Sequence, residues 1–146
     1  MKGLKWNGKG YNNKGIKDFQ LRQGRGRGKE YYNNGIIEFE GEYSNGIRNG
    51  KGKLYHDNGK LKYEGEFLNG TKNGFAKEYY DNGQIEFEGE YENGTKNGYA
   101  KSYYNNGILE FDGRYENGRK AFGKEYDDTG KLIHEGDYDP GICIII

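Results

Sequence analysis

The sequence predicts an all-β protein, built as an elongated single-layer antiparallel sheet of repeated β-hairpins. Three observations lead to this fold class. A unit of about 24 residues recurs between residues 26 and 139, an Asn-Gly pair stands at a fixed place in the first four of the five units, and apolar and charged residues alternate after that pair. A fixed period of this size indicates an array of one small supersecondary unit, and the Asn-Gly pairs indicate that the unit is a hairpin.

Each hairpin consists of a short strand, an Asn-Gly turn and a longer strand. The turn pairs stand 24 residues apart, at Asn34-Gly35, Asn58-Gly59, Asn82-Gly83 and Asn106-Gly107. Both residues of such a pair tolerate a positive φ, which favours a tight two-residue turn. A second linker, such as residues 69–74, joins each hairpin to the next. The chain is therefore expected to be a meander of about ten strands without a helix.

The long strands predict a face of aromatic rings over small residues. In residues 37–43, apolar or small side chains alternate with glutamates, so the two kinds point to opposite faces. A glycine in the middle of a strand marks a close approach of backbones. A two-residue turn places Gly41 opposite Gly28, whereas a three-residue loop would shift this register. The equivalent pairs are Gly65 with Gly52, Gly89 with Ala76, and Gly113 with Ala100.

The charged columns keep the same register and predict a solvated face of ion pairs. The cations are Lys29, Lys53, Lys77 and Lys101, and they fall opposite Glu40, Glu64, Glu88 and Asp112. Opposite charges directly across a strand pair stabilise a sheet modestly. We interpret this face as a solubilising surface rather than as acid–base machinery.

The ends depart from the repeat. We divide the chain into a degenerate basic N-terminal cap (1–25), five repeats (26–139) and an apolar C-terminal tail (140–146). Residues 1–29 hold nine Lys/Arg and one Asp, which gives +8, and the remainder carries −8, so the net charge is zero. A single Cys excludes an internal disulfide. No secretory signal and no apolar stretch of about 20 residues is present. We expect a cytoplasmic protein, with a peripheral membrane location left open.

Catalysis is not predicted. The two histidines, His56 and His134, replace aromatic strand residues of other repeats, and no Cys/His cluster offers a zinc site. The Gly-rich basic stretch at residues 25–28 lacks the spacing of a phosphate-binding loop. We therefore predict no enzyme activity, no metal site and no cofactor. The basic start, with Trp6 and Tyr11, is too little to predict a nucleic-acid partner.

One column of cations is a candidate site for anionic lipid. It consists of Arg48, Lys72, Lys96 and Lys120, which are spaced by 24 residues. Two strands per repeat would place these charges about 10 Å apart along one edge of the sheet. A straight basic row can meet a flat anionic membrane surface. The competing interpretation is that they are solvated turn residues.

A second candidate is a face for a protein partner. The aromatic columns supply it, and the residues singled out are Tyr31, Tyr55, Tyr79 and Tyr103. Most aromatics must form the core, but a single layer without a covering helix leaves apolar area open, and open patches mark partner sites. Exposed edge strands are also compatible with a homodimer.

The tail Cys143-Ile144-Ile145-Ile146 has the form of a prenylation signal. The preceding residues are acidic rather than polybasic. A truncated gene or an apolar last strand explains the tail equally well, and the sequence leaves these alternatives open.

The units at residues 63–74 and 87–98 resemble MORN repeats, whose pattern is Tyr-x-Gly-x-aromatic-x-Asn-Gly followed by Gly-x-Gly. The longer spacing is similar to the MORN-variant repeat of bacterial YwqK-type antitoxin proteins. Ala76 and Ala100 depart from it, where the family often has Gly. The resemblance implies a non-catalytic scaffold for protein–protein interaction, with peripheral binding to acidic phospholipid as a further role. The alternative it implies is an antitoxin-like inhibitory partner of a toxin protein.

Overall fold

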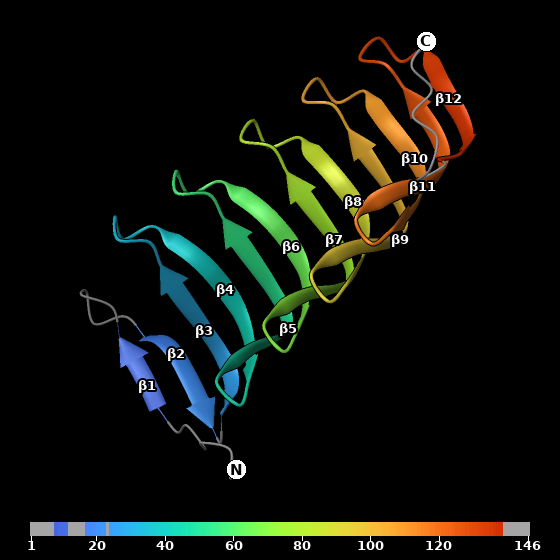
Figure 1. The fold of residues 1–146 in the computed structure, drawn as a ribbon. Coiled ribbons are helices and arrows are strands. Elements are labelled where there is room, and N and C mark those ends of the chain that lie inside the picture. The colour runs from blue at the N-terminus through green and yellow to red at the C-terminus, as the bar shows by residue number, and fades with distance from the viewer. Residues whose placement is uncertain (1–7, 12–16, 23, 139–146) are drawn as a thin grey trace.

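The computed structural model describes residues 8–11, 17–22 and 24–138. These residues form one antiparallel sheet of twelve strands that follow one another in sequence order, and none of them is helical. The strands are β1 (Gly8–Tyr11), β2 (Lys17–Arg22), β3 (Arg25–Tyr31), β4 (Ile37–Ser44), β5 (Ile47–Tyr55), β6 (Leu61–Leu68), β7 (Thr71–Tyr79), β8 (Ile85–Glu92), β9 (Thr95–Tyr103), β10 (Leu109–Glu116), β11 (Arg119–Tyr126) and β12 (Leu132–Asp137). Figure 1 shows the hairpins side by side along one axis. The predicted fold class is confirmed.

The Asn-Gly turns inside the repeats are three-residue loops, so the predicted two-residue loop is wrong. In the first of them, the amide of Gly35 donates to the carbonyl of Tyr32 (2.9 Å) and the amide of Tyr32 donates to the carbonyl of Ile36 (2.8 Å). Gly35 has a φ of 81°, whereas Asn34 is not in the left-handed region. This geometry is that of a turn closed by a left-handed glycine, the usual three-residue hairpin loop.

A bulge next to each of these loops cancels the register shift that the longer loop causes. In the first hairpin Glu38 is the extra residue, because its two neighbours pair with the adjacent residues Tyr31 and Glu30. Every predicted pair is therefore confirmed. These pairs are Gly28–Gly41, Gly52–Gly65, Ala76–Gly89 and Ala100–Gly113, and beside them Lys29–Glu40, Lys53–Glu64, Lys77–Glu88 and Lys101–Asp112.

The linkers between repeats contain the two-residue turns. Asn45 and Gly46 both have positive φ, of 54° and 77°, as a type I′ turn requires. Beyond the turn, Tyr43 pairs with Arg48 whereas Gly41 pairs with Gly52, so β5 contains two extra residues. Bulges bend a strand, and Figure 1 shows the strands curving at this end of the sheet.

The fifth repeat differs at this linker. Arg114 pairs with Phe122 and Tyr115 pairs with Lys120, so β11 has one extra residue where β5, β7 and β9 have two. The linker of this repeat is one residue shorter in the sequence. The deletion therefore falls in the bulge, and the register of the sheet beyond it is preserved.

The bend allows a single sheet to bury a core. The face with the aromatic core is called the inner face below, and the opposite face with the Lys/Glu pairs the outer face. The buried apolar residues are Phe39, Tyr63, Phe67, Ala76, Phe87, Tyr91, Ala100, Phe111 and Tyr115. Tyr43, Leu54 and Tyr138 pack against them. Nearly all of this core is aromatic, as expected from the small aliphatic content of the chain.

The glycine pairs under the rings are predicted to be unequal in their tolerance of a side chain. A Cβ at either glycine would lie within 2.7 Å of a ring carbon of Phe39, but a Cβ at Gly41 would also lie 2.7 Å from the Cα of Gly52 and 2.8 Å from the carbonyl oxygen of Lys51, whereas the three nearest atoms at Gly52 all belong to side chains. Alanine already stands at the positions equivalent to Gly52 in the third and fourth repeats. We expect Gly41→Ala to lower the free energy of unfolding in urea by about 1–3 kcal/mol, and Gly52→Ala by less than half as much. Equal losses of stability for the two substitutions would contradict this account of the glycine pairs.

Candidate functional site

The inner face carries one continuous row of aromatic rings. Neighbouring rings meet edge to face, with centroids 5.1 to 6.0 Å apart. In order along the sheet, the row passes through Tyr43, Phe39, Phe67, Tyr63, Tyr91, Phe87, Tyr115, Phe111 and Tyr138. This arrangement is the favourable one for aromatic pairs. The row crosses every hairpin from β3 to β12 and ties the repeats together.

The four cations predicted to line an exposed loop edge lie within strands and cover this aromatic row. Arg48, Lys72, Lys96 and Lys120 belong to β5, β7, β9 and β11, and 21 to 28% of each side chain is exposed. Each charged group lies 4.0 to 5.2 Å from the centroid of an aromatic ring. Their predicted placement on a loop edge is therefore corrected. The bulges and the bend turn them inward, where they make cation–π contacts.

Carboxylates neutralise these cations. Glu30 accepts hydrogen bonds from the guanidinium of Arg48 at 2.9 and 2.5 Å and from the hydroxyl of Tyr43 at 2.5 Å. Glu78 pairs with both Lys72 and Lys96, the latter at 3.4 Å. In the last repeat one lysine pairs with two carboxylates. Lys120 contacts Glu110 at 2.9 Å and Glu125 at 2.6 Å. The basic row is thus paired, which leaves little net charge for a membrane.

In most repeats the tyrosine and the glutamate of such a cluster occur together, whereas in the fourth repeat Ser102 stands in place of the glutamate and accepts from the hydroxyl of Tyr115 (3.5 Å). The two residues are 13 positions apart, as in Tyr43 with Glu30 and Tyr138 with Glu125. Where Leu54 replaces the glutamate, Phe67 replaces the tyrosine, so that neither a carboxylate nor a hydroxyl is left without its partner. A buried polar group that lacks a partner is costly, and the paired replacement avoids that cost.

The electrostatics of the clusters follow from these contacts. Hydrogen bonding to Arg48 outweighs burial and lowers the pKa of Glu30. Burial raises the pKa of Glu78, but the hydrogen bond from Lys72 and the charges of Lys72 and Lys96 outweigh it, so the pKa of Glu78 is lowered. Burial, together with hydrogen bonding to Glu30, raises the pKa of Tyr43. Glu30 and Glu78 therefore stay ionised, and Tyr43 stays neutral, throughout the physiological pH range.

The predicted partner residues Tyr31, Tyr55, Tyr79 and Tyr103 do not belong to the buried aromatic row. Two of them show why, because Tyr55 donates a hydrogen bond to Glu40 (2.6 Å) and Tyr103 donates one to Glu88 (2.7 Å). Burial and these carboxylates raise the pKa of each of the two tyrosines to about 12. Both acceptors belong to the outer ion pairs. This column therefore lies on the outer face, and its binding of a partner stays a prediction.

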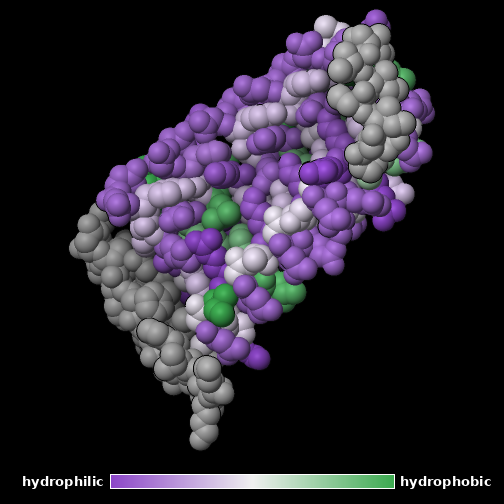
Figure 2. All heavy atoms as spheres, in the orientation of Figure 1, coloured by the Kyte–Doolittle hydropathy of each residue, from purple (hydrophilic) through white to green (hydrophobic). Residues whose placement is uncertain are grey.

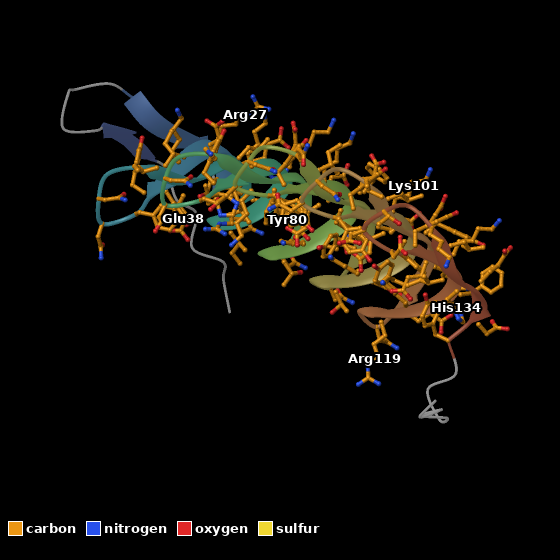
Figure 3. The ribbon with its side chains drawn as sticks, turned by 90° about the horizontal axis from the view of Figure 1, so that it is seen from above. Arg27, Glu38, Tyr80, Lys101, Arg119 and His134 are labelled. Carbon is orange, nitrogen blue, oxygen red and sulfur yellow. The ribbon has the colours of Figure 1, made fainter. Side chains whose placement is uncertain are left out.

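The outer face carries a column of ion pairs that runs across the sheet. Four of the pairs are Lys29–Glu40, Lys53–Glu64, Lys77–Glu88 and Lys101–Asp112, at 3.4 to 3.5 Å. Figure 3 shows Arg27 and Lys101 on the opposite side of the ribbon from Glu38 and Tyr80. In the space-filling view, hydrophobic residues appear only as small separate patches among hydrophilic ones (Figure 2).

Sequence reasoning missed a row of exposed aromatics on this outer face. Phe75, Tyr99 and Phe122 are 58, 70 and 52% exposed. They follow the linker glycine or alanine in β7, β9 and β11, inside the bulged part of each strand. Each stands two positions before a lysine of the outer ion pairs, so alternation along the strand assigns all three to the outer face. Their recurrence at intervals of 24 and 23 residues was the available signal.

No catalytic or metal-binding arrangement appears in the part of the chain that the structure describes. That part contains no group of three His, Cys, Asp or Glu side chains that could hold a metal ion. His56 lies 3.4 Å from the carbonyl oxygen of Tyr79, and His134 packs against the ring of Tyr138 at 4.3 Å. Within the same ranges, no helix is long and apolar enough to cross a bilayer. Cys143 and the tail at 140–146 lie outside the described residues.

The inner clusters predict an acid-sensitive fold. Folding lowers the pKa of Glu30, Glu78 and Glu125. Their contribution to the free energy of unfolding is therefore complete above the unfolded pKa of about 4.3, and it is lost as the pH falls through the lower pKa values of the folded state. We expect the melting temperature to drop below this pH. Glu78→Gln should lower the free energy of unfolding by about 1.5–3 kcal/mol at pH 7. It should also make the loss of stability at acidic pH smaller than in the wild type.

The matched control for this measurement is Glu64→Gln, which breaks an outer pair between side chains that are 42 and 49% exposed. It should change the free energy of unfolding by less than about 1 kcal/mol. Equal effects of the two substitutions would show that the inner carboxylates have no special role.

Comparison with known proteins agrees with this architecture. The family model described as MORN repeat matches residues 39–60, 63–85 and 87–108, and that of the MORN repeat variant matches residues 25–45. The three MORN segments begin at Phe39, Tyr63 and Phe87, which are fully buried rings of the inner row. No curated protein matches the chain. From the matched segments and the hairpin array together, we conclude that the chain belongs to the MORN repeat family.

Proposed function

We propose that this protein is a non-catalytic scaffold that binds a partner protein through the outer face of β7 to β11. The observation that supports the proposal is the exposed row of Phe75, Tyr99 and Phe122. Aromatic residues are enriched in protein interfaces, and exposed apolar residues that gather in one place mark binding surfaces. The inner aromatic row is a weaker candidate, because cations and carboxylates already cover it.

Two other roles were predicted for the chain. Binding of acidic phospholipid by Arg48, Lys72, Lys96 and Lys120 gains no support from the geometry, since all four cations have carboxylate partners. An antitoxin-like role would be a special case of the proposed scaffold, with a toxin as the bound protein. It predicts that the captured partner is an enzyme whose activity the chain inhibits.

The test is affinity capture from an extract of the native host with three forms of the full chain. The first is the wild type, and the second is the triple variant Phe75→Thr, Tyr99→Thr, Phe122→Thr, in which threonine preserves strand propensity. The third is the control Ile47→Thr, Leu68→Thr, which alters two exposed residues (49 and 45%) outside this row.

We expect a protein that the wild type and the control retain and that the triple variant retains roughly tenfold less, which corresponds to about 1.4 kcal/mol. Circular dichroism and thermal melting of the three forms should coincide, because exposed substitutions usually change stability little. Equal retention by all three forms, or none by the wild type, would contradict the proposal.

A further inference from the structure

From the spacing of the outer row we infer that the partner segment is a proline-rich peptide in the polyproline II conformation, lying across the strands. The inference rests on the proposed function and specifies the chemistry of the partner. The three aromatics, Phe75, Tyr99 and Phe122, lie on alternate strands of the sheet, β7, β9 and β11. Alternate strands are about 9.6 Å apart. One turn of a polyproline II helix contains three residues and rises about 9.3 Å, so a proline at every third residue can meet one ring after another.

The same strands supply a second wall with the same period. Lys77, Lys101 and Lys124 stand two positions after the three aromatics, and each pairs with a carboxylate of a neighbouring strand at 3.2 to 3.5 Å. An ammonium group has three donors, so one ion pair leaves donors for a further acceptor. A polyproline II helix has no internal hydrogen bonds, and its carbonyls need such donors. Each turn of the peptide thus meets one aromatic ring and one lysine from a single strand.

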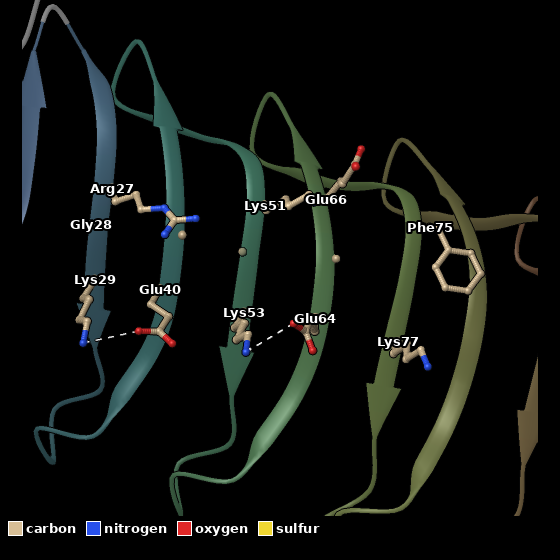
Figure 4. A pocket seen from close by; sticks show the side chains of 13 residues that line it. Arg27, Gly28, Lys29, Glu40, Lys51, Lys53, Glu64, Glu66, Phe75 and Lys77 are labelled. Atoms are coloured by element: carbon tan, nitrogen blue, oxygen red, sulfur yellow. Dashed lines mark ion pairs between the residues drawn. The ribbon is translucent and has the colours of Figure 1, made fainter.

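The floor between these walls is the backbone of the sheet itself. Under the aromatic row this backbone belongs to Ala76, Ala100 and Gly123, which are buried and whose Cα substituents face the aromatic rings of the inner face. Towards β3 the same floor continues as a groove of about 840 Å³, lined by Gly28, Gly41, Gly52 and Gly65 and by the side chains of both walls. Phe75 belongs to this lining, and Figure 4 shows it beyond Lys51 and Glu66 on the same side of the groove. Phe75 and Lys77 stand at the end of this groove, and Tyr99 and Phe122 continue the aromatic row beyond it; the groove and the row together are called the track below.

Charge defines the two ends of the track. In β3 and β5 the aromatic is replaced by Arg27 and Lys51. Arg27 pairs with Glu42 at 3.4 Å but has a side chain that is 78% exposed, and Lys51 forms no ion pair with any described residue. Beside Phe75 lie Glu66 and Glu90, which are exposed, and between Tyr99 and Phe122 lies Arg114, which pairs with Glu116 of its own strand at 3.3 Å. The complementary ligand is a peptide with prolines at every third residue and an acidic end that reaches Arg27 and Lys51. The acids beside the rings disfavour a nucleic acid, whose phosphates they would repel.

The test is fluorescence anisotropy with the full chain and labelled synthetic peptides of about 13 residues, the length that spans the track from β3 to β11. The first peptide repeats Pro-x-x and ends in glutamates. The second has the same composition with the prolines in an aperiodic order, and the third has lysines in place of the glutamates. Single-stranded oligouridine is the fourth probe.

We expect the periodic acidic peptide to bind at least about tenfold more tightly than the other three probes. The variant Phe75→Thr, Tyr99→Thr, Phe122→Thr should lose that difference, whereas Ile47→Thr, Leu68→Thr should keep it. Equal binding of the periodic and aperiodic peptides, no binding of either, or a preference for oligouridine would overturn the inference.

The two proposals fail in different ways. If the aromatic variant loses a captured host protein but the periodic peptide does not bind, the scaffold function stands and the polyproline II ligand is wrong. If no host protein is retained through this face, the proposed function itself is wrong, whatever the synthetic peptide does.

Discussion

The fold depends on edge-to-face packing of aromatic rings over a floor of glycine and alanine. A single-layer sheet has no second layer to cover an apolar face, and every domain must bury such a face against something. Here the bulged linkers bend each hairpin, so that Tyr43 packs against Phe39 of its own strand and Phe67 packs against Phe39 of the preceding repeat. Because each ring touches rings of its own and adjacent repeats, the array acts as one body, in which nearest-neighbour contacts supply the stability.

The open side of this aromatic row is closed by charge rather than by apolar groups. A cation lies over each fully buried ring, and a carboxylate satisfies the cation. Where one carboxylate is missing, at Leu54, the neighbouring Glu78 pairs with both Lys72 and Lys96. The network is thus shared between repeats and tolerates substitution. Covering the inner face in this way leaves the outer face as the surface available for a partner.

The sequence predicted more of the sheet than of the candidate site. Strand alternation and the period were sufficient for the glycine pairs and for the Lys29–Glu40 type of ion pair, although the loop length was wrong, because the bulge at Glu38 compensates for it. Arg48 was placed on a loop edge because residues 45–50 were interpreted as a linker, whereas β5 begins directly after a two-residue turn. The two extra residues of the bulge preserve the parity of the strand, so alternation counted back from Lys77 assigns Phe75 to the outer face.

The most direct test of the central role of the aromatic row compares two phenylalanines in urea unfolding. Phe87 is fully buried, with ring contacts to Tyr91 and Tyr115 and with Lys96 above it, whereas Phe75 is 58% exposed. Phe87→Ala should lower the free energy of unfolding by about 3–5 kcal/mol, and Phe75→Ala by less than about 1 kcal/mol. Similar losses for both would contradict the account, since stability would then come from backbone pairing and not from the row of rings.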